Sequence, residues 1–294
     1  MTIAERTKFI WRLRSRTLQL GERTLLMGIV NVTPDSFSDG GNYASTQAAV
    51  AHAVQLLDDG ADVIDIGGES TRPGSSAATD AGMQAVEEQR RVLPVIEGVL
   101  RARPHAVVSV DTYRASTARL AVAAGAEIVN DVSGGLWDPE MLGTCADMQC
   151  GVVVMHTRGL PSEWASQAPL STEEVVPLVL DGLRNRVAAA IAAGVIRDRI
   201  LVDPGFGFGK RGAENWALLA GLDRIHELGL PVLVGLSRKG FLDPSKPAPA
   251  RDAATHAADV EAIHAGAHVL RVHDVRGALV SLSAIETAVE QQKK

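Results

Sequence analysis

The stretch Gly60-Ala-Asp-Val-Ile-Asp65 decides the fold, because close copies recur at Gly125-Ala-Glu-Ile-Val-Asn130 and Gly266-Ala-His-Val-Leu-Arg271. Looser copies begin at Gly194 and Gly229. In each copy a glycine, suited to the left-handed position just after a helix, precedes a short apolar run. The repeat therefore predicts a helix that ends and a buried strand that begins, several times along the chain.

Short apolar runs that stop at polar residues extend this pattern over the whole chain. Runs of this kind are typical of parallel strands buried on both faces. They are Leu25–Val30, Val63–Ile66, Ala106–Val110, Glu127–Val129, Val152–Met155, Ile200–Val202, Pro231–Val234 and Val269–Leu270. Segments with helical spacing separate them, so strand and helix alternate eight times. This alternation predicts an α/β fold, a (β/α)8 TIM barrel, with an open doubly wound sheet as the alternative.

Two further features concern the edges of this pattern. The capping box Ser171-Thr-Glu-Glu174 marks a helix start, but Pro177 lies inside that helix and predicts a kink or a later start. Residues 9–22 place Trp11 and Leu13 in alternation with polar residues around a turn, which predicts a β-hairpin on the barrel floor. No linker is long enough to separate domains, so residues 1–294 are expected to form a single domain.

Composition excludes several classes of partner. The chain has 294 residues, 46% of them hydrophobic and 22% charged, with a net charge of −6, which argues against nucleic acid and anionic membranes. The longest wholly apolar stretch, Val187–Ile196, is far shorter than the ~20 residues of a membrane-spanning helix. No signal peptide is evident, and Cys145 and Cys150 have no CxxC spacing, so both are expected to be reduced thiols. These features predict a cytoplasmic protein.

Three polar residues at strand ends indicate a pocket for a flat heterocycle. Asp111, Asn130 and Asp203 follow the third, fourth and sixth runs. In a barrel these ends converge, and carboxylates with an amide can pair with amino and ring N–H groups of a pyrimidine-like edge. The alternative is that each residue only caps the helix that follows.

The glycine-rich stretch Gly205-Phe-Gly-Phe-Gly-Lys210 comes directly after Asp203. It fits neither the Walker A template nor the dinucleotide-binding template. Its glycines would let the backbone approach a flat ligand closely, and a flexible turn is the alternative.

Basic residues at the last two strand ends indicate an anion site. Ser237-Arg-Lys239 and Arg271-Val-His273 stand where barrels of this type often bind phosphate, although a solvated basic patch is the alternative. Asn31 could help to hold Mg²⁺ that is mostly ligated by phosphate and water. A zinc site at His156 and His273 is disfavoured, because no HxxxH pair surrounds them. His156 receives no role.

Several blocks of this sequence together resemble the bacterial dihydropteroate synthases, a family of pterin-binding TIM-barrel enzymes. The resemblance covers nearly the whole chain after the hairpin. Its blocks are Met27–Gly41, Asp65–Gly74, Val110-Asp111, Asn130–Gly134, Met155-His156, Asp203–Lys210, Ser237–Lys239 and Arg271–Val275. The stretch Thr157-Arg158-Gly159, where relatives more often carry methionine, and the segment 242–254 depart from the family pattern.

The resemblance implies a transferase of folate biosynthesis. It would join 6-hydroxymethyl-7,8-dihydropterin pyrophosphate to p-aminobenzoate, giving 7,8-dihydropteroate and pyrophosphate. It also implies Mg²⁺ as cofactor, inhibition by sulfonamides and a homodimer. A pterin-dependent methyltransferase and a non-catalytic pterin-binding paralogue are the alternatives.

The resemblance also assigns residues. Asp111, Asp203, Lys239 and Arg271 would be catalytic. The pterin would be held by Asp111, Asn130, Asp203, Gly207, Phe208 and Lys239. Pyrophosphate would lie on Arg271 and His273 with Asn31 near its Mg²⁺, and Ser237 would meet the aminobenzoate carboxylate. Phe37, Thr71, Arg72 and Pro73 would belong to two loops that cover the second substrate.

Overall fold

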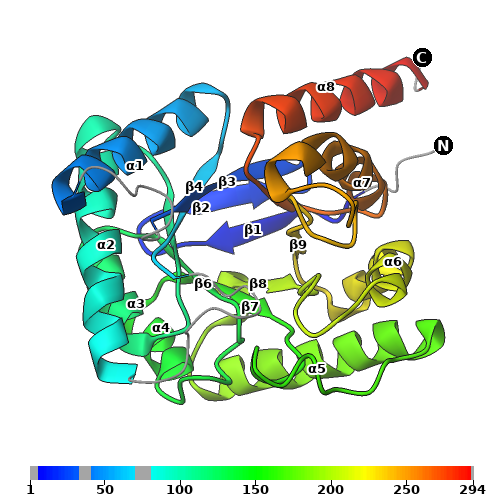
Figure 1. The fold of residues 1–294 in the computed structure, drawn as a ribbon, viewed down its shortest axis with the longest axis horizontal. Coiled ribbons are helices and arrows are strands. Elements are labelled where there is room, and N and C mark those ends of the chain that lie inside the picture. Colours follow the sequence, from blue (N-terminus) through cyan, green and yellow to red (C-terminus); the bar gives the residue numbers. More distant parts are fainter. Residues whose placement is uncertain (1–5, 33–40, 70–80, 293–294) are drawn as a thin grey trace.

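Parallel strands in chain order form the centre of the molecule. The computed structural model describes residues 6–32, 41–69 and 81–292 (Figure 1). The strands are β3 (Leu25–Asn31), β4 (Val63–Gly67), β5 (Val108–Asp111), β6 (Ile128–Asp131), β7 (Gly151–Met155), β8 (Ile200–Asp203), β9 (Leu233–Val234) and β10 (Val269–Val272). Their spatial order is β8-β7-β6-β5-β4-β3-β10-β9, and a bridge between Val202 and Val232 joins the two ends. The predicted (β/α)8 barrel is confirmed as a nearly closed one.

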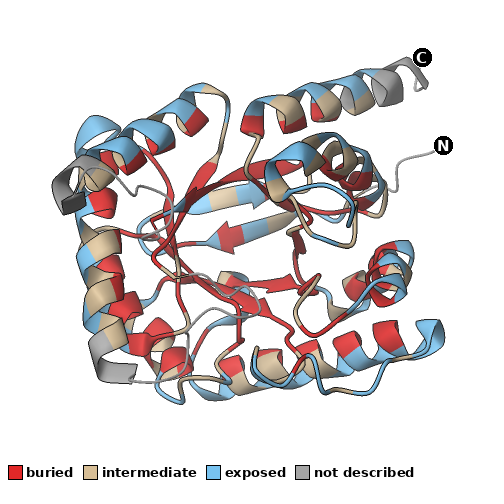
Figure 2. Cartoon of the chain, viewed as in Figure 1, coloured by how far each residue is buried: buried red, intermediate tan, exposed pale blue. Residues whose placement is uncertain are grey.

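Helices surround the strands as a ring, and Figure 2 shows their buried faces turned toward the strands. They are α1 (Gly41–Asp58), α2 (Ala81–Ala102), α3 (Ala115–Ala123), α4 (Met141–Met148), α5 (Thr172–Ala192), α6 (Ala213–Ala220), α7 (Asp252–His264) and α8 (Val275–Gln292), with 3₁₀ turns at Arg197–Arg199, Leu222–Leu228 and Ala248–Arg251. The repeat glycines Gly60, Gly125 and Gly266 have φ values of +107°, +113° and +92°. The left-handed backbone predicted between helix and strand is therefore present.

Helix α5 differs from the expectation drawn from Pro177. The helix begins at Thr172 and runs through the proline, so a later start is wrong. The capping box between Ser171 and Glu174 satisfies the first turn, and Val175 and Val179 are buried against the core. Cap and packing together outweigh the backbone hydrogen bond that the proline cannot make.

The N-terminal hairpin consists of β1 (Phe9–Arg12) and β2 (Thr17–Leu20), which pair antiparallel. Its Trp11 is 1% exposed and donates from Nε1 to the carbonyl oxygen of Arg199 at 2.8 Å. One apolar cluster unites Trp11, Leu13 and Leu20 of the hairpin segment with Leu25, Met27, Val63, Val107, Ile128, Val153, Leu201, Leu233 and Val269. Because these partners come from every part of the barrel, the hairpin closes its floor as predicted.

The layer above this floor is polar. Side chains alternate along a strand, so the residue two positions after an interior residue also points inward. These successive pairs are Val63 and Asp65, Ile128 and Asn130, Leu201 and Asp203, and Val269 and Arg271. The barrel thus changes from an apolar interior to a polar one within two residues on each of four strands.

Candidate active site

A buried ion-pair network occupies the polar layer. The guanidinium of Arg271 donates from Nε to Oδ2 of Asp65 at 2.6 Å and from a terminal nitrogen to Oδ2 of Asp111 at 2.5 Å. The side-chain amide of Asn130 donates to the same Asp65 oxygen at 2.9 Å. Side chains from β4, β5, β6 and β10 therefore meet at one point, and Asp111 and Asn130 lie together there as expected.

Asp65 is a site residue that the sequence reasoning missed, because it lies inside an apolar run rather than at its end. It is fully buried, and its Oδ1 has no hydrogen-bond partner among the described residues. The repeat held the signal: Asp65, Asn130 and Arg271 are the last residues of the three aligned copies. Equivalent positions in equivalent strands reach the same interior layer, and Asn130 and Arg271 both donate to Asp65 there.

Burial and charge act against each other in this network. Burial lowers the pKa of Arg271, but the carboxylates of Asp65 and Asp111 outweigh it and raise that pKa above its ordinary value. Burial raises the pKa of Asp111 to about 7, although Arg271 opposes the rise. The arginine is therefore a permanent cation, whereas the proton on Asp111 can be exchanged near neutral pH.

Asp203 ends β8 and is 6% exposed. Its Oδ1 accepts a hydrogen bond from the backbone N–H of Gly205 at 2.7 Å. Burial raises the pKa of Asp203, while this hydrogen bond and the charges of Lys239 and Arg271 oppose the rise. Asp203 is thus a second buried acceptor at the mouth, with cations on both sides.

The glycine-rich loop brings Phe208 and Gly207 to Lys239. The Nζ atom of Lys239 lies 4.4 Å from the ring centroid of Phe208, within the range of a cation–π contact. A Cβ placed on Gly207 would lie 3.5 Å from that nitrogen. The loop and the Ser237-Arg-Lys239 motif after β9, separate in sequence, therefore form one wall.

The predicted anion-site residues do not all lie together. Ser237 Oγ lies 2.9 Å from Nδ1 of His273 and accepts from the His273 backbone N–H at 3.1 Å, so these two predicted residues are together. Arg238 instead forms a two-point ion pair with Asp252 of α7, at 2.7 and 2.9 Å. Arg271 points to the acidic network, and its assignment to pyrophosphate stays a prediction.

The remaining predicted site residues have no described contact with the network. Asn31 is exposed at the end of β3, next to Gly67 of β4 in the strand register. Phe37, Thr71, Arg72 and Pro73 lie outside the described residues. In the described ranges 6–32, 41–69 and 81–292, no group of three His, Cys, Asp or Glu side chains could hold a metal ion.

His156, which had no assigned role, is a buried and neutral side chain packed against α5. Burial and the nearby charges of Lys210 and Arg158 lower its pKa to about 2. A Cβ on Gly182 of α5 would lie 2.4 Å from its ring, so the ring packs directly against the helix backbone. These contacts account for His156 through packing.

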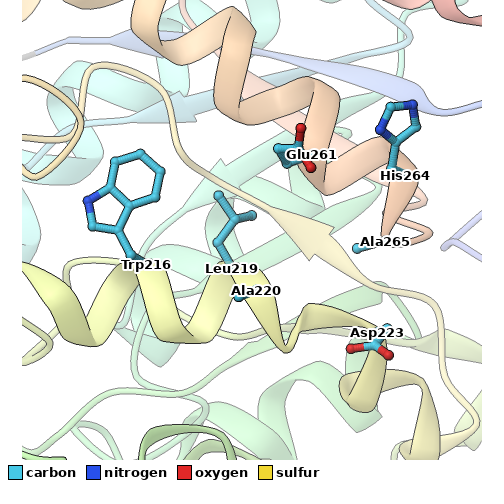
Figure 3. Close-up of a pocket in the computed structure, with 7 residues that line it drawn as sticks. All are labelled: Trp216, Leu219, Ala220, Asp223, Glu261, His264 and Ala265. Atoms are coloured by element: carbon cyan, nitrogen blue, oxygen red, sulfur yellow. The ribbon is translucent and has the colours of Figure 1, made fainter. Parts of the chain in front are cut away.

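A groove of about 420 Å³ opens between outer helices (Figure 3). Trp216 and Leu219 of α6 line one side, and Glu261 and His264 of α7 line the other. Trp216 is 46% exposed. The groove shares no residue with the charged network, so it is a separate surface feature.

The chain was compared with known protein families and with individual proteins. The family model described as "Pterin binding enzyme" matches residues 27–273. A dihydropteroate synthase of Streptococcus pyogenes serotype M1 is 44% identical over 255 residues, covering 85% of this chain and 90% of the relative.

Two solved structures extend the likeness. The Xanthomonas albilineans dihydropteroate synthase with 4-aminobenzoic acid has a TM-score of 0.86 at 45% identity, covering 96% of this chain and 98% of that one. The Yersinia pestis enzyme in complex with a sulfonamide drug has a TM-score of 0.85 at 37% identity, with 95% and 99% covered.

Proposed function

The chain belongs to the family of pterin-binding enzymes, and we propose that it acts there as a dihydropteroate synthase. The protein is a transferase of folate biosynthesis. It joins 6-hydroxymethyl-7,8-dihydropterin pyrophosphate to p-aminobenzoate and releases pyrophosphate. The observation that carries this function is the buried network of Asp65, Asp111, Asn130 and Arg271 beside Asp203, at the carboxyl ends of the strands.

The acidic layer suits the amino and ring N–H groups of a pterin. Asp203 and Asp111 accept hydrogen bonds as carboxylates, and Asn130 can both donate and accept. Charge-assisted hydrogen bonds in a buried site contribute more than neutral ones. Lys239 and Phe208 form the adjacent wall, so the cation and the aromatic ring lie where a flat heterocycle would stack.

The reaction itself develops charge at two places. The C–O bond between the pterin methylene and pyrophosphate breaks, and the positive charge at that carbon is shared by the electron-rich ring held by Asp203 and Asp111. A bond then forms from the p-aminobenzoate nitrogen to the methylene carbon, and the amine loses a proton. Arg271 and His273 stabilise the departing anion, since fixed charges in a water-poor site act strongly on developing charge. We propose that departure precedes attack.

The proposed cofactor is Mg²⁺, with Asn31 as its protein contact. Mg²⁺ usually keeps several waters and binds substrate phosphates with only one or two protein ligands. The single amide oxygen of Asn31, exposed at the end of β3, fits such a site. When bound, the ion would supply charge neutralisation on the pyrophosphate. Chelation should therefore abolish product formation, and added Mg²⁺ should restore it.

The second substrate is proposed to enter beside Ser237. Its hydroxyl, fixed by His273, would meet the carboxylate of p-aminobenzoate. Sulfonamides resemble that substrate, so they compete for the same position. Thr71, Arg72, Pro73 and Phe37 are proposed to contact this second substrate.

We also propose a homodimer in the cytoplasm. The half-exposed Trp216 beside the α6–α7 groove suits burial against a second copy, because aromatic residues are enriched in such interfaces. The free thiols of Cys145 and Cys150 suit a reducing compartment. Among the described helices, none is long and apolar enough to cross a membrane. Light scattering on Trp216→Glu should give the monomer mass where the wild type gives the dimer mass.

The test of the function is product formation from the two substrates. Purified protein is mixed with the dihydropterin pyrophosphate, Mg²⁺ and p-aminobenzoate, and pyrophosphate release is followed together with dihydropteroate. Release that depends on p-aminobenzoate is expected, with inhibition by a sulfonamide. Release without aminobenzoate-dependent product would contradict the proposal, and methyl transfer would support the methyltransferase alternative.

A further inference from the structure

Lys210, at the end of the glycine-rich loop, is a buried lysine inside a cage of backbone carbonyls. It is 3% exposed. Its Nζ atom donates to the carbonyl oxygens of Gly205 at 2.7 Å, Phe208 at 3.3 Å and His156 at 3.4 Å. An ammonium group has three N–H donors and no acceptor, so each donor has a matching oxygen.

The loop needs this cage because of its backbone. Gly205, Gly207 and Gly209 have φ values of +71°, +80° and +72°, so every second residue is left-handed. A Cβ on Gly205 would lie 1.9 Å from the carbonyl oxygen of His156, which shows how closely the two backbones approach. The backbone N–H groups of Phe208 and Arg158 already donate to the carbonyl oxygens of Gly205 and Phe208, at 3.2 and 3.4 Å. Lys210 adds a charged donor to both of these oxygens and to the buried carbonyl of His156, which also requires a partner.

The same loop shapes the pterin half of the site. It starts at Asp203, whose carboxylate accepts from Gly205, and it carries Phe208 to Lys239. Asn215 of α6 fixes the outer side, accepting from the Gly207 N–H at 2.7 Å and donating to the Lys210 carbonyl at 2.9 Å. Movement of the loop would therefore displace the ring of Phe208 and the hydrogen bond at Asp203 together.

Burial of the charged Lys210 side chain costs free energy of desolvation. Burial lowers its pKa to about 7, with Lys239 and Arg158 acting in the same direction and Asp203 and Glu214 opposing. An apolar side chain of similar length would avoid this desolvation cost, but it would leave the three backbone carbonyls with fewer donors. The lysine therefore holds these carbonyls at a cost in desolvation, which suits a loop whose geometry matters for a ligand.

We propose that Lys210 is a positioning residue for the pterin substrate, holding the carbonyls of residues 156, 205 and 208 so that Asp203, Phe208 and Lys239 keep their mutual arrangement. It does not touch the reacting atoms. The inference rests on the proposed function and adds a residue to it.

The test separates the two substrates. Lys210→Met removes all three donors, and Lys210→Gln keeps two N–H donors without the charge. Lys8→Met is the matched control, because Lys8 is exposed on the hairpin and pairs only with Glu22 at 3.2 Å among the described residues. Calorimetry with the dihydropterin pyrophosphate and no p-aminobenzoate gives pterin affinity. The KM for p-aminobenzoate is measured at saturating pterin.

Lys210→Met should weaken pterin binding by about tenfold or more, because it removes all three donors that hold the loop. Lys210→Gln should weaken it by about threefold, because it keeps two N–H donors. The KM for p-aminobenzoate should stay within about twofold of wild type. Lys8→Met should match wild type in both readouts.

Wild-type pterin affinity in Lys210→Met would overturn the proposal, and so would an equal loss for both substrates. If the methionine variant does not fold, Lys210→Gln decides in the same way, with thermal unfolding as the check on its fold. A wild-type protein that binds pterin but forms no product would refute the synthase function, and the binding comparison would still judge Lys210.

Discussion

The floor and the mouth of this barrel use the same strands for opposite purposes. At the floor, Val63, Val269 and their neighbours meet Trp11 in an apolar cluster. Two residues further along, Asp65 and Arg271 form buried ion pairs. Apolar burial stabilises the fold directly, whereas buried charges cost desolvation and are kept where a ligand needs them. Substitutions should therefore divide the molecule into a part that sets stability and a part that sets binding.

The largest expected effect is at the mouth. Asp203→Ala removes a buried acceptor and should weaken pterin binding by about 10³-fold or more, since it would lose two charge-assisted hydrogen bonds. The unfolding free energy should change by less than about 1 kcal/mol, because removal of a buried carboxylate also removes its desolvation cost. Calorimetry and urea unfolding measure the two quantities. Unchanged pterin affinity would refute the role of Asp203.

The floor should show the reverse. Trp11→Ala removes a fully buried indole and its hydrogen bond to Arg199, and should lower the unfolding free energy by about 3–4 kcal/mol. The KM values of the two substrates should stay unchanged at a temperature where the variant is folded. Altered pterin affinity with normal stability would break the division between floor and mouth.

Asp259 of α7 tests whether a buried carboxylate outside the mouth contributes to the stability of the fold. It is 1% exposed, and neither oxygen has a hydrogen-bond partner among the described residues. Burial raises its pKa to about 8. The folded protein therefore holds a proton there that the unfolded chain releases above about pH 4, and the fold loses stability as the pH rises from about 4 to 8.

Asp259→Asn removes this proton linkage and should raise the unfolding free energy by up to about 4 kcal/mol at pH 7, with almost no gain near pH 4. Thermal unfolding at several pH values measures the effect. Asp147→Asn is the control, because Asp147 is exposed on α4. Destabilisation by Asp259→Asn at pH 7 would contradict the prediction and show that this carboxyl group stabilises the fold.

The smallest effect is a pH dependence at Asp111. Its pKa of about 7 means that a proton occupies the carboxylate as the pH falls through neutrality. The anionic form accepts from the pterin, so affinity should decrease about tenfold per pH unit below that value. Calorimetry from pH 5 to 8 measures the slope, and Asp111→Asn should remove it. A slope that persists in Asp111→Asn would assign the titration to another group.

The sequence predicted the barrel well because strand ends and helix ends are local signals. Gly60 and Gly125 mark helix ends through backbone geometry that few other residues tolerate. Pro177 misled because the packing of Val175 and Val179, which no local pattern reports, outweighs its cost. Asp65 was missed for a different reason: it lies inside an apolar run, and its alignment with Asn130 and Arg271 in the repeat was the one sequence signal of its place in the interior.

The pairing of Arg271 with Asp65 and Asp111 was also beyond sequence reasoning. The positive charge of Arg271 predicted an anion site. The sequence gives that charge but does not show which neighbouring side chains pair with it. In the fold, β10 lies next to β3 and β4 follows, so the arginine can reach across the interior to acidic residues more than 150 positions earlier. Charge assignments from sequence therefore need the strand order before roles can be separated.

The hairpin also has a consequence for the order of folding. It is synthesised before the barrel strands, yet its apolar partners extend to Leu233 and Val269 in the last two strands of the barrel. Contacts so distant in sequence form late and slow the folding of a domain. Trp11 and Leu13 therefore stay exposed until the last strand of the barrel is made, and the newly made chain is prone to aggregate at this hairpin.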